Sequence, residues 1–180
     1  LKLNIEESEK YKGYKELFDN FYKVKTDKRE EEFINRFGLK YITQNYNINN
    51  KSYNNLQSII NKIDVNQFYN NLLYTSFHGD LQFDNIIYHP SYKKFTYIDW
   101  RESFGGSTKG GDIYYDLAKL YGGSIIPYNI MKDEDSISLV EGSTVISYSY
   151  PISDNLNEFR KHYEKWIVAN GFDLNKVKLI

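Results

Sequence analysis

One segment near the middle of the chain carries most of the chemical information: HGDLQFDN at residues 78–85, followed by IDW at residues 98–100. Between them, residues 86–88 predict a strand, residues 89–94 a turn and residues 95–98 a returning strand. A hairpin of this kind brings its two polar ends together. We therefore expect the reactive side chains of this segment to converge at the open end of one β-hairpin.

Three of these side chains, Asp80, Asn85 and Asp99, form the candidate site. Mg²⁺ prefers carboxylates, amide oxygens, waters and substrate phosphates as ligands. Two such ligands and a further carboxylate suit phosphoryl transfer, in which positioning and charge neutralisation supply most of the catalysis. A carboxylate beside an acceptor hydroxyl can orient the hydroxyl and accept its proton. Asp99 follows an apolar strand, where a carboxylate is costly unless it is paired or bound to metal.

The order of these residues resembles the catalytic core of the aminoglycoside phosphotransferase and choline kinase families, which have the protein-kinase-like fold. The shared set is His-Gly-Asp, an Asn five positions after that Asp, the hairpin, Ile-Asp-Trp and an Asp-Leu-Ala helix segment. The resemblance implies that Asp80 is the catalytic base and that Asn85 and Asp99 bind Mg²⁺ and, through it, ATP. It also implies that His78 is a structural residue of the loop and that Asp116 braces the loop by hydrogen bonds.

Helical periodicity dominates both sides of the segment. Before it, we expect helices at residues 4–25, from a cap at Thr26–Asp27 to Tyr41, at 53–63 and after a cap at Asp64, with a polar loop at 45–52. After it, we expect a Gly-rich loop at 105–111, a helix at 112–121 that ends at Gly122–Gly123, a second hairpin within 136–150 and a helix at 155–170. The pattern predicts a mainly helical α+β fold.

Two of these helices have a clear apolar face, and we expect the face of the helix at residues 53–63 to lie inward. The second helix carries Phe33, Ile34, Phe37 and Tyr41 on one face, and the third carries Leu56, Ile59, Ile60 and Ile63 on its inward face. By the resemblance, the whole chain is the C-terminal lobe of a protein-kinase-like fold. The smaller lobe of such enzymes carries a phosphate-covering loop and a lysine. Residues 1–74 show neither feature, so we expect a single lobe from a longer chain. We expect this lobe to fold by itself but not to turn over ATP by itself.

The composition excludes several classes of protein. The 180 residues are 41% hydrophobic and contain no cysteine, which suits one folded unit and excludes a disulfide scaffold or a cysteine-ligated metal site. No apolar run approaches the roughly 18 residues of a membrane span, and residues 1–25 do not show the pattern of a signal peptide. The net charge of −1, with both signs interspersed, does not suit a nucleic-acid-binding protein. We expect a cytoplasmic protein whose partners are small molecules.

The preferred hypothesis is the catalytic lobe of an ATP-dependent phosphotransferase with a small hydroxylated acceptor. That acceptor would be a sugar, an amino alcohol or an aminoglycoside, in bacterial capsule or surface polysaccharide biosynthesis. One alternative is a non-catalytic kinase-like binding or scaffolding module, and a less favoured one is a Mg²⁺-dependent phosphatase. Taken alone, Asp80 would be a turn residue beside Gly79. Only the ordered set of residues gives it a function.

Overall fold

The computed structural model describes six stretches of the chain: residues 13–64, 66–69, 73–131, 137–139, 143–148 and 152–180. In these stretches helices dominate, and short strands form one four-stranded sheet and two strand pairs. The expected helix-rich α+β fold is confirmed at this level. None of the described helices is long and apolar enough to span a membrane.

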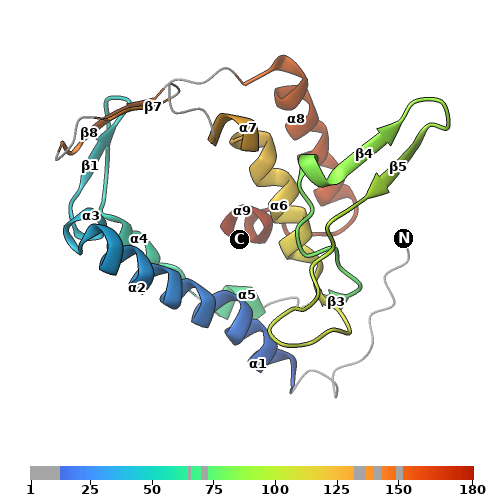
Figure 1. Ribbon diagram of the computed structural model, residues 1–180, viewed down its shortest axis with the longest axis horizontal. Coiled ribbons are helices and arrows are strands. Elements are labelled where there is room, and N and C mark those ends of the chain that lie inside the picture. The colour runs from blue at the N-terminus through green and yellow to red at the C-terminus, as the bar shows by residue number, and fades with distance from the viewer. Residues whose placement is uncertain (1–12, 65, 70–72, 132–136, 140–142, 149–151) are drawn as a thin grey trace.

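The elements follow one another in two groups, before and after the loop at residues 78–85. The first group is α1 (Tyr14–Phe18), the π-helical η2 (Asp19–Val24), α2 (Lys25–Phe37), α3 (Lys40–Thr43), β1 (Tyr46–Ile48), β2 (Lys51–Tyr53), α4 (Leu56–Ile60), α5 (Asn66–Tyr69) and β3 (Tyr74–Thr75). The second is the 3₁₀ turn η3 (Phe83–Asn85), β4 (Ile86–His89), β5 (Lys94–Tyr97), β6 (Gly111–Asp112), α6 (Ile113–Ile125), α7 (Tyr128–Met131), β7 (Ile137–Leu139), β8 (Val145–Tyr148), α8 (Asp154–Ala169) and α9 (Leu174–Leu179). In Figure 1 the four-stranded sheet lies at the left, and the hairpin of β4 and β5 projects at the right.

The main hydrophobic core forms around α6, whose apolar residues recur every three or four positions. Tyr114, Leu117 and Tyr121 are buried in this core, which α8 and α9 complete. Asp112 begins the helix, because its carboxylate accepts a hydrogen bond from the backbone N–H of Tyr114 at 3.1 Å. Packing and capping together hold the first turns of α6 in place.

Helix α6 continues through Gly122 and Gly123, where the sequence predicted its end. Its last turn is held by packing: Ser124 is fully buried, and its carbonyl accepts a hydrogen bond from the Arg160 guanidinium of α8 at 3.1 Å. A glycine inside a helix costs about 1 kcal/mol relative to alanine. The contacts between α6 and α8 offset that cost, so the predicted stop was wrong because tertiary packing overrides the local signal.

The predicted helix at residues 155–170 is confirmed as α8. Ser153 caps its N-terminus by accepting a hydrogen bond from the backbone N–H of Leu156 at 3.3 Å. Gly171, at φ +79°, lies just past its last turn in a conformation that glycine adopts without strain. Beyond it, Asp173 caps a short helix, α9, that the periodicity did not predict.

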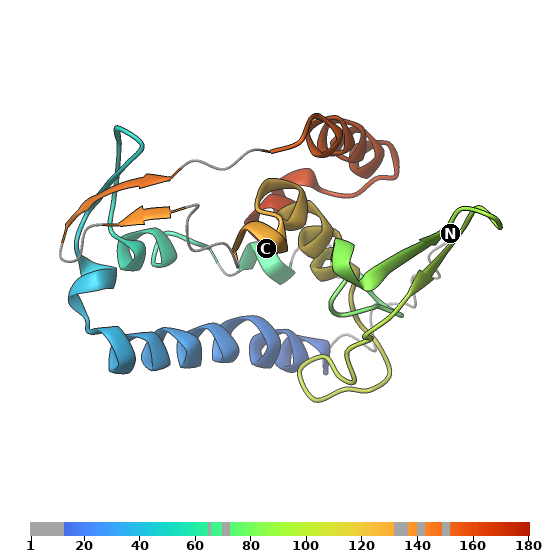
Figure 2. The ribbon, with the colours of Figure 1, turned by 45° about the horizontal axis from the view of Figure 1, so that its top comes forward.

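Residues 14–37 form one continuous helical segment, α1, η2 and α2. The predicted break at Thr26–Asp27 is absent, because the Asp27 carboxylate pairs with Lys23 one turn earlier at 2.5 Å and does not cap a new helix. The part of the predicted first helix at residues 4–12 lies outside the described residues. A single rod therefore replaces two predicted helices, as Figure 2 shows.

An aromatic cluster joins this rod to the loop after β5. Phe18 and Phe21 are buried against Phe104, with ring centroids 5.0 and 4.2 Å from that of Phe104. The turn after Phe104 approaches the helix so closely that a Cβ at Gly105 would lie 2.1 Å from the backbone oxygen of Leu17. The cluster thereby fixes the N-terminal end of the rod beside the candidate site.

The apolar faces of the second and third predicted helices are only partly covered by the rest of the described chain. Phe33 and Phe37 are 39% and 48% exposed, and their rings contact each other at 4.8 Å. Leu56 and Ile59 of α4 are also exposed. The inward placement was therefore wrong for Leu56 and Ile59, whereas Ile60 and Ile63 are half-buried. Helical periodicity shows that one face is apolar but not that the folded chain covers all of it.

The predicted polar loop at residues 45–52 is instead the hairpin of β1 and β2. Its two turn residues, Asn49 and Asn50, have φ values of +51° and +65°, as a type I′ turn requires. Strand β1 also pairs in parallel with β8, with Ile48 opposite Ile146, and β8 pairs with β7. The predicted second hairpin is thus confirmed as β7 and β8, and part of its turn lies outside the described residues.

The hairpin predicted after the loop is confirmed as β4 and β5, which pair antiparallel with Ile86 opposite Tyr97. A second pair, β3 with β6, places Thr75 opposite Gly111. The loop at residues 78–85 therefore leaves β3 beside the start of α6 and enters β4. The loop therefore lies between the core helix α6 and the projecting hairpin of β4 and β5 (Figure 1).

Candidate functional site

The loop at residues 78–85 is held from beneath by Asp116 on the first turns of α6. The buried Asp116 carboxylate accepts hydrogen bonds from the backbone N–H of His78 at 2.6 Å and of Gly79 at 2.7 Å. Burial raises the pKa of Asp116 above its usual value, and the two hydrogen bonds oppose that rise. The hydrogen bonds expected of Asp116 are present, so the loop backbone is tied to the core helix.

Glycine is required at position 79 of this loop. Gly79 has φ +81°, and a Cβ there would lie 2.4 Å from the Cβ of Arg101. The Arg101 backbone N–H donates to the His78 carbonyl at 2.8 Å, and its Nε donates to the Gly79 carbonyl at 2.9 Å. The segment after the hairpin thus closes over the loop and leaves no room for a side chain.

His78 is buried, which is compatible with the structural role that the resemblance implies. It is 4% exposed, and its ring lies against the Trp100 ring with centroids 4.7 Å apart. Its Nδ1 accepts a hydrogen bond from the backbone N–H of Asp80 at 3.3 Å. Through this contact the histidine helps to set the backbone from which the Asp80 side chain projects.

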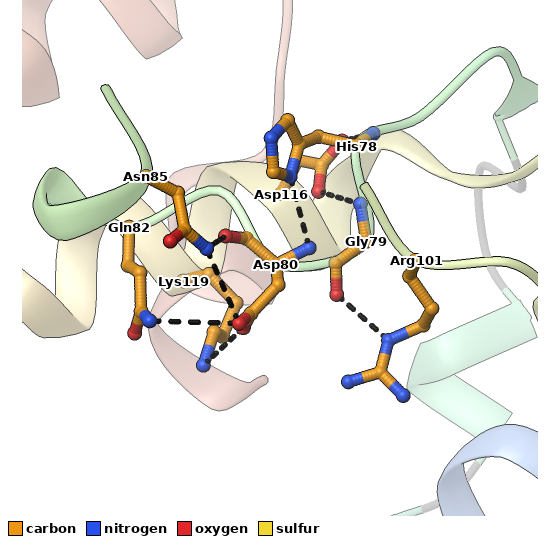
Figure 3. Close-up of polar contacts among 8 residues, drawn as sticks. All are labelled: His78, Gly79, Asp80, Gln82, Asn85, Arg101, Asp116 and Lys119. Atoms are coloured by element: carbon orange, nitrogen blue, oxygen red, sulfur yellow. Dashed lines mark hydrogen bonds and ion pairs between the residues drawn. The ribbon is translucent and has the colours of Figure 1, made fainter. Parts of the chain in front are cut away.

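The Asp80 carboxylate lies at the surface of the loop and pairs with a lysine that the sequence motifs did not reveal. Its Oδ1 lies 2.8 Å from Nζ of Lys119, and the Asp80 side chain is 23% exposed (Figure 3). Lys119 follows Asp116 by one helical turn, so both residues lie on the same face of α6. That spacing is the signal that could have identified Lys119, once Asp116 was placed under the loop.

Asn85 contacts Asp80 directly and is itself buried. Its Nδ2 donates to the Asp80 carbonyl at 2.8 Å and lies 3.4 Å from Asp80 Oδ2. These two contacts orient the amide nitrogen toward the loop, which leaves the oxygen, Oδ1, as the end of the side chain that can bind a cation (Figure 3). The structure therefore brings together two of the three predicted site residues.

Asp99 follows a residue whose backbone pairs with that of Asn85, but the Asp99 side chain contacts neither Asp80 nor Asn85. The backbone N–H of Ile98 donates to the Asn85 carbonyl at 3.0 Å, which extends the β4–β5 ladder by one step. Asp99 has φ +60°, a conformation that residues other than glycine rarely adopt outside turns and functional sites. Its side chain is exposed and has no hydrogen-bond or ion-pair partner among the described residues. The argument from a buried carboxylate was therefore wrong for Asp99.

A pocket of about 480 Å³ opens beside the loop. Gln82 and Asp84 line it from the loop, and Tyr115, Lys119 and Tyr128 line it from the helices. Because Lys119 both lines the pocket and pairs with Asp80, a molecule in the pocket would lie close to the Asp80 carboxylate. The pocket is large enough for one small organic molecule.

The possible metal ligands are few. Within the described ranges, no three His, Cys, Asp or Glu side chains gather closely enough to hold a metal ion. Asn85 Oδ1 and the Asp99 carboxylate, both oxygen donors, could share an ion with a ligand's phosphates. Comparison with protein-family models, with curated proteins and with solved structures finds no significant match.

Proposed function

We propose that this chain is the catalytic lobe of an ATP-dependent phosphotransferase that acts on a hydroxyl group of a small acceptor. The observation that carries the proposal is the loop itself: Asp116 clamps its backbone and Asn85 closes onto Asp80 beside a pocket. With the ordered motif, this geometry favours the C-terminal lobe of a protein-kinase-like fold. The use of ATP implies action in the cytoplasm.

In this proposal Asp80 orients the acceptor hydroxyl and accepts its proton as the phosphoryl group transfers. The carboxylate suits that role because its backbone is fixed by Asp116 through His78 and Gly79. Such a side chain loses little entropy when the acceptor binds. The ion pair with Lys119 holds the carboxylate next to a residue that lines the pocket, from which the hydroxyl would approach.

The residues at the hairpin fit a nucleotide-bound Mg²⁺. Asn85 has its amide nitrogen committed to Asp80, so its oxygen is the donor, and the exposed Asp99 carboxylate supplies the charge. When bound, the ion would neutralise charge on the transferring phosphoryl group. Asn85 and Asp99 would hold the ion and, through it, the nucleotide's phosphates, and Asp80 alone would handle the proton.

The proposal is tested by Asp80→Asn in the natural protein that contains this chain. With Mg²⁺, γ-labelled ATP and a panel of sugars, sugar phosphates and amino alcohols, we expect transfer by the wild type and a loss of about 10²–10⁴-fold in the variant. Asp154→Asn, an exposed Asp on the first turn of α8, is the matched control and should retain activity. Wild-type transfer that survives Asp80→Asn would refute the assignment.

One observation favours the alternative of a non-catalytic binding module. Both carboxylate oxygens of Asp80 are already engaged, Oδ1 by Lys119 and Oδ2 by Gln82 and Asn85. A module of this kind would bind nucleotide or acceptor equally well with Asp80→Asn and would transfer no phosphate in either form. A phosphatase would release inorganic phosphate in the same assay without an acceptor.

A further inference from the structure

Two positively charged side chains contact the loop at residues 78–85, and a third lies beside one of them: Lys119 pairs with Asp80, and Arg101 donates to the Gly79 carbonyl. Lys119 comes from α6, Arg101 follows β5, and Lys25 lies at the start of α2. Lys25 Nζ lies 4.6 Å from the centroid of the Phe21 ring, and the Arg101 guanidinium carbon lies 5.7 Å from the same centroid. One buried aromatic ring therefore brings Lys25 and Arg101 together.

Arg101 is anchored in a way that leaves its outer nitrogens available. Its Nε donates to the Gly79 carbonyl at 2.9 Å, whereas its two Nη groups make no hydrogen bond in the part of the chain that the structure describes. In Figure 3 the ends of Arg101 and Lys119 both lie on the side of the loop that faces away from His78. A guanidinium fork held in this way is suited to a phosphate or carboxylate.

The cations repel one another in the absence of an anion. The pKa of Lys25 is lowered, first by burial and then by the charges of Arg101, Arg29 and Lys119, while Asp80 opposes this shift. Like charges that act on one another in this way disfavour the charged state of each group unless a counter-charge joins them. One carboxylate, that of Asp80, is too little negative charge for the cluster, so the arrangement favours binding of an anionic group.

We propose that Lys25, Arg101 and Lys119 bind a phosphate group of the acceptor, next to the hydroxyl that Asp80 orients. The acceptor is then a phosphorylated sugar or polyol, since these cations would repel an amino alcohol or an aminoglycoside. The identification as an acceptor rests on the proposed phosphotransferase function. Binding of the anion does not depend on that function.

Binding is measured without nucleotide, by titrating glucose 6-phosphate, inorganic phosphate, glucose and choline into ¹⁵N-labelled protein. We expect the two phosphates to shift the backbone amide signals of Gly79 and Asp80, with affinities that fall as salt is raised. Lys25→Met should weaken binding of both about tenfold. Lys28→Met, at an exposed position of the same helix, is the matched control and should bind as the wild type does. Arg101→Lys, which keeps the charge but loses the fork, provides a second test in case Lys25→Met fails to fold.

The outcomes separate this inference from the proposed function. Equal binding by wild type and Lys25→Met, or choline bound more tightly than glucose 6-phosphate, would overturn the acceptor assignment. Competition between a non-hydrolysable ATP analogue with Mg²⁺ and glucose 6-phosphate would also overturn it, because the cations would then serve the nucleotide. Lys25-dependent phosphate binding that is compatible with the ATP analogue supports the anion site. If no transfer accompanied such binding, the phosphotransferase proposal would fail while the anion site stood.

Discussion

The clamp under the loop makes a quantitative prediction for Asp116→Asn. The carboxylate accepts two short backbone hydrogen bonds, and each hydrogen bond to a charged group contributes about 1.5–3 kcal/mol. An amide can accept one of them but must turn its NH₂ toward the other N–H, which leaves a buried donor without an acceptor. Since burial already disfavours the charged carboxylate, the neutral amide recovers part of this loss. We expect a net destabilisation of about 2 kcal/mol.

Denaturant unfolding followed by circular dichroism measures this change. For a chain of this length a loss of about 2 kcal/mol lowers the melting temperature by about 4–8 °C. We also expect the amide signals of His78 and Gly79 to shift and the affinity for phosphate to fall, because the loop loses its anchor. Asp154→Asn again serves as the control. A melting temperature and loop signals identical to those of the wild type would show that Asp116 does not hold the loop.

Three further changes test other parts of the structure. Gly79→Ala should destabilise the protein by about 2–4 kcal/mol in thermal unfolding, because its Cβ would meet Arg101; unchanged stability would contradict the positive φ. Burial raises the pKa of Asp112 from 3.8 to about 6, so its contribution to stability is greatest below pH 4 and is lost as the pH rises through 6. Asp112→Asn should flatten the unfolding free energy between pH 4 and 7, and an unchanged slope would exclude Asp112 as its source. Phe37→Ser should alter the melting temperature by no more than about 2 °C, because the ring is 48% exposed; a larger fall would show that the ring is covered.

Local patterns predicted the elements whose stabilising contacts are local. The hairpin after the loop and helix α8 were predicted because strand alternation, turn residues and a terminal glycine lie within a few positions of one another. The hydrogen bonds of Asp116 were expected from an ordered motif. Predictions failed where distant contacts decide: α6 passes Gly122 because its last turn packs against α8 at the buried Ser124, and the apolar faces of α2 and α4 stay partly exposed.

The candidate site shows the same limit. Asp80 and Asn85 are five residues apart, and their contact follows from one short loop. Lys119 and Lys25 reach the site from helices on either side of it in the sequence, and neither belongs to a motif. Their role depends on how the helices pack, which periodicity does not specify. The exposure of the Asp99 side chain likewise depends on which parts of the chain pack against the hairpin, and periodicity does not specify this packing.

The parallel pairing of β1 with β8 has a consequence for the order of folding. Asn49 and Tyr148, separated by 99 positions, exchange two hydrogen bonds: the Asn49 side chain donates to the Tyr148 carbonyl and accepts from its N–H. Closing a loop of that length costs about 4 kcal/mol in chain entropy. During synthesis the β1–β2 hairpin therefore keeps an open edge until β8, at Val145–Tyr148, has emerged. The four-stranded sheet is a late step, and the amides of β1 should gain protection from hydrogen exchange only when β8 docks.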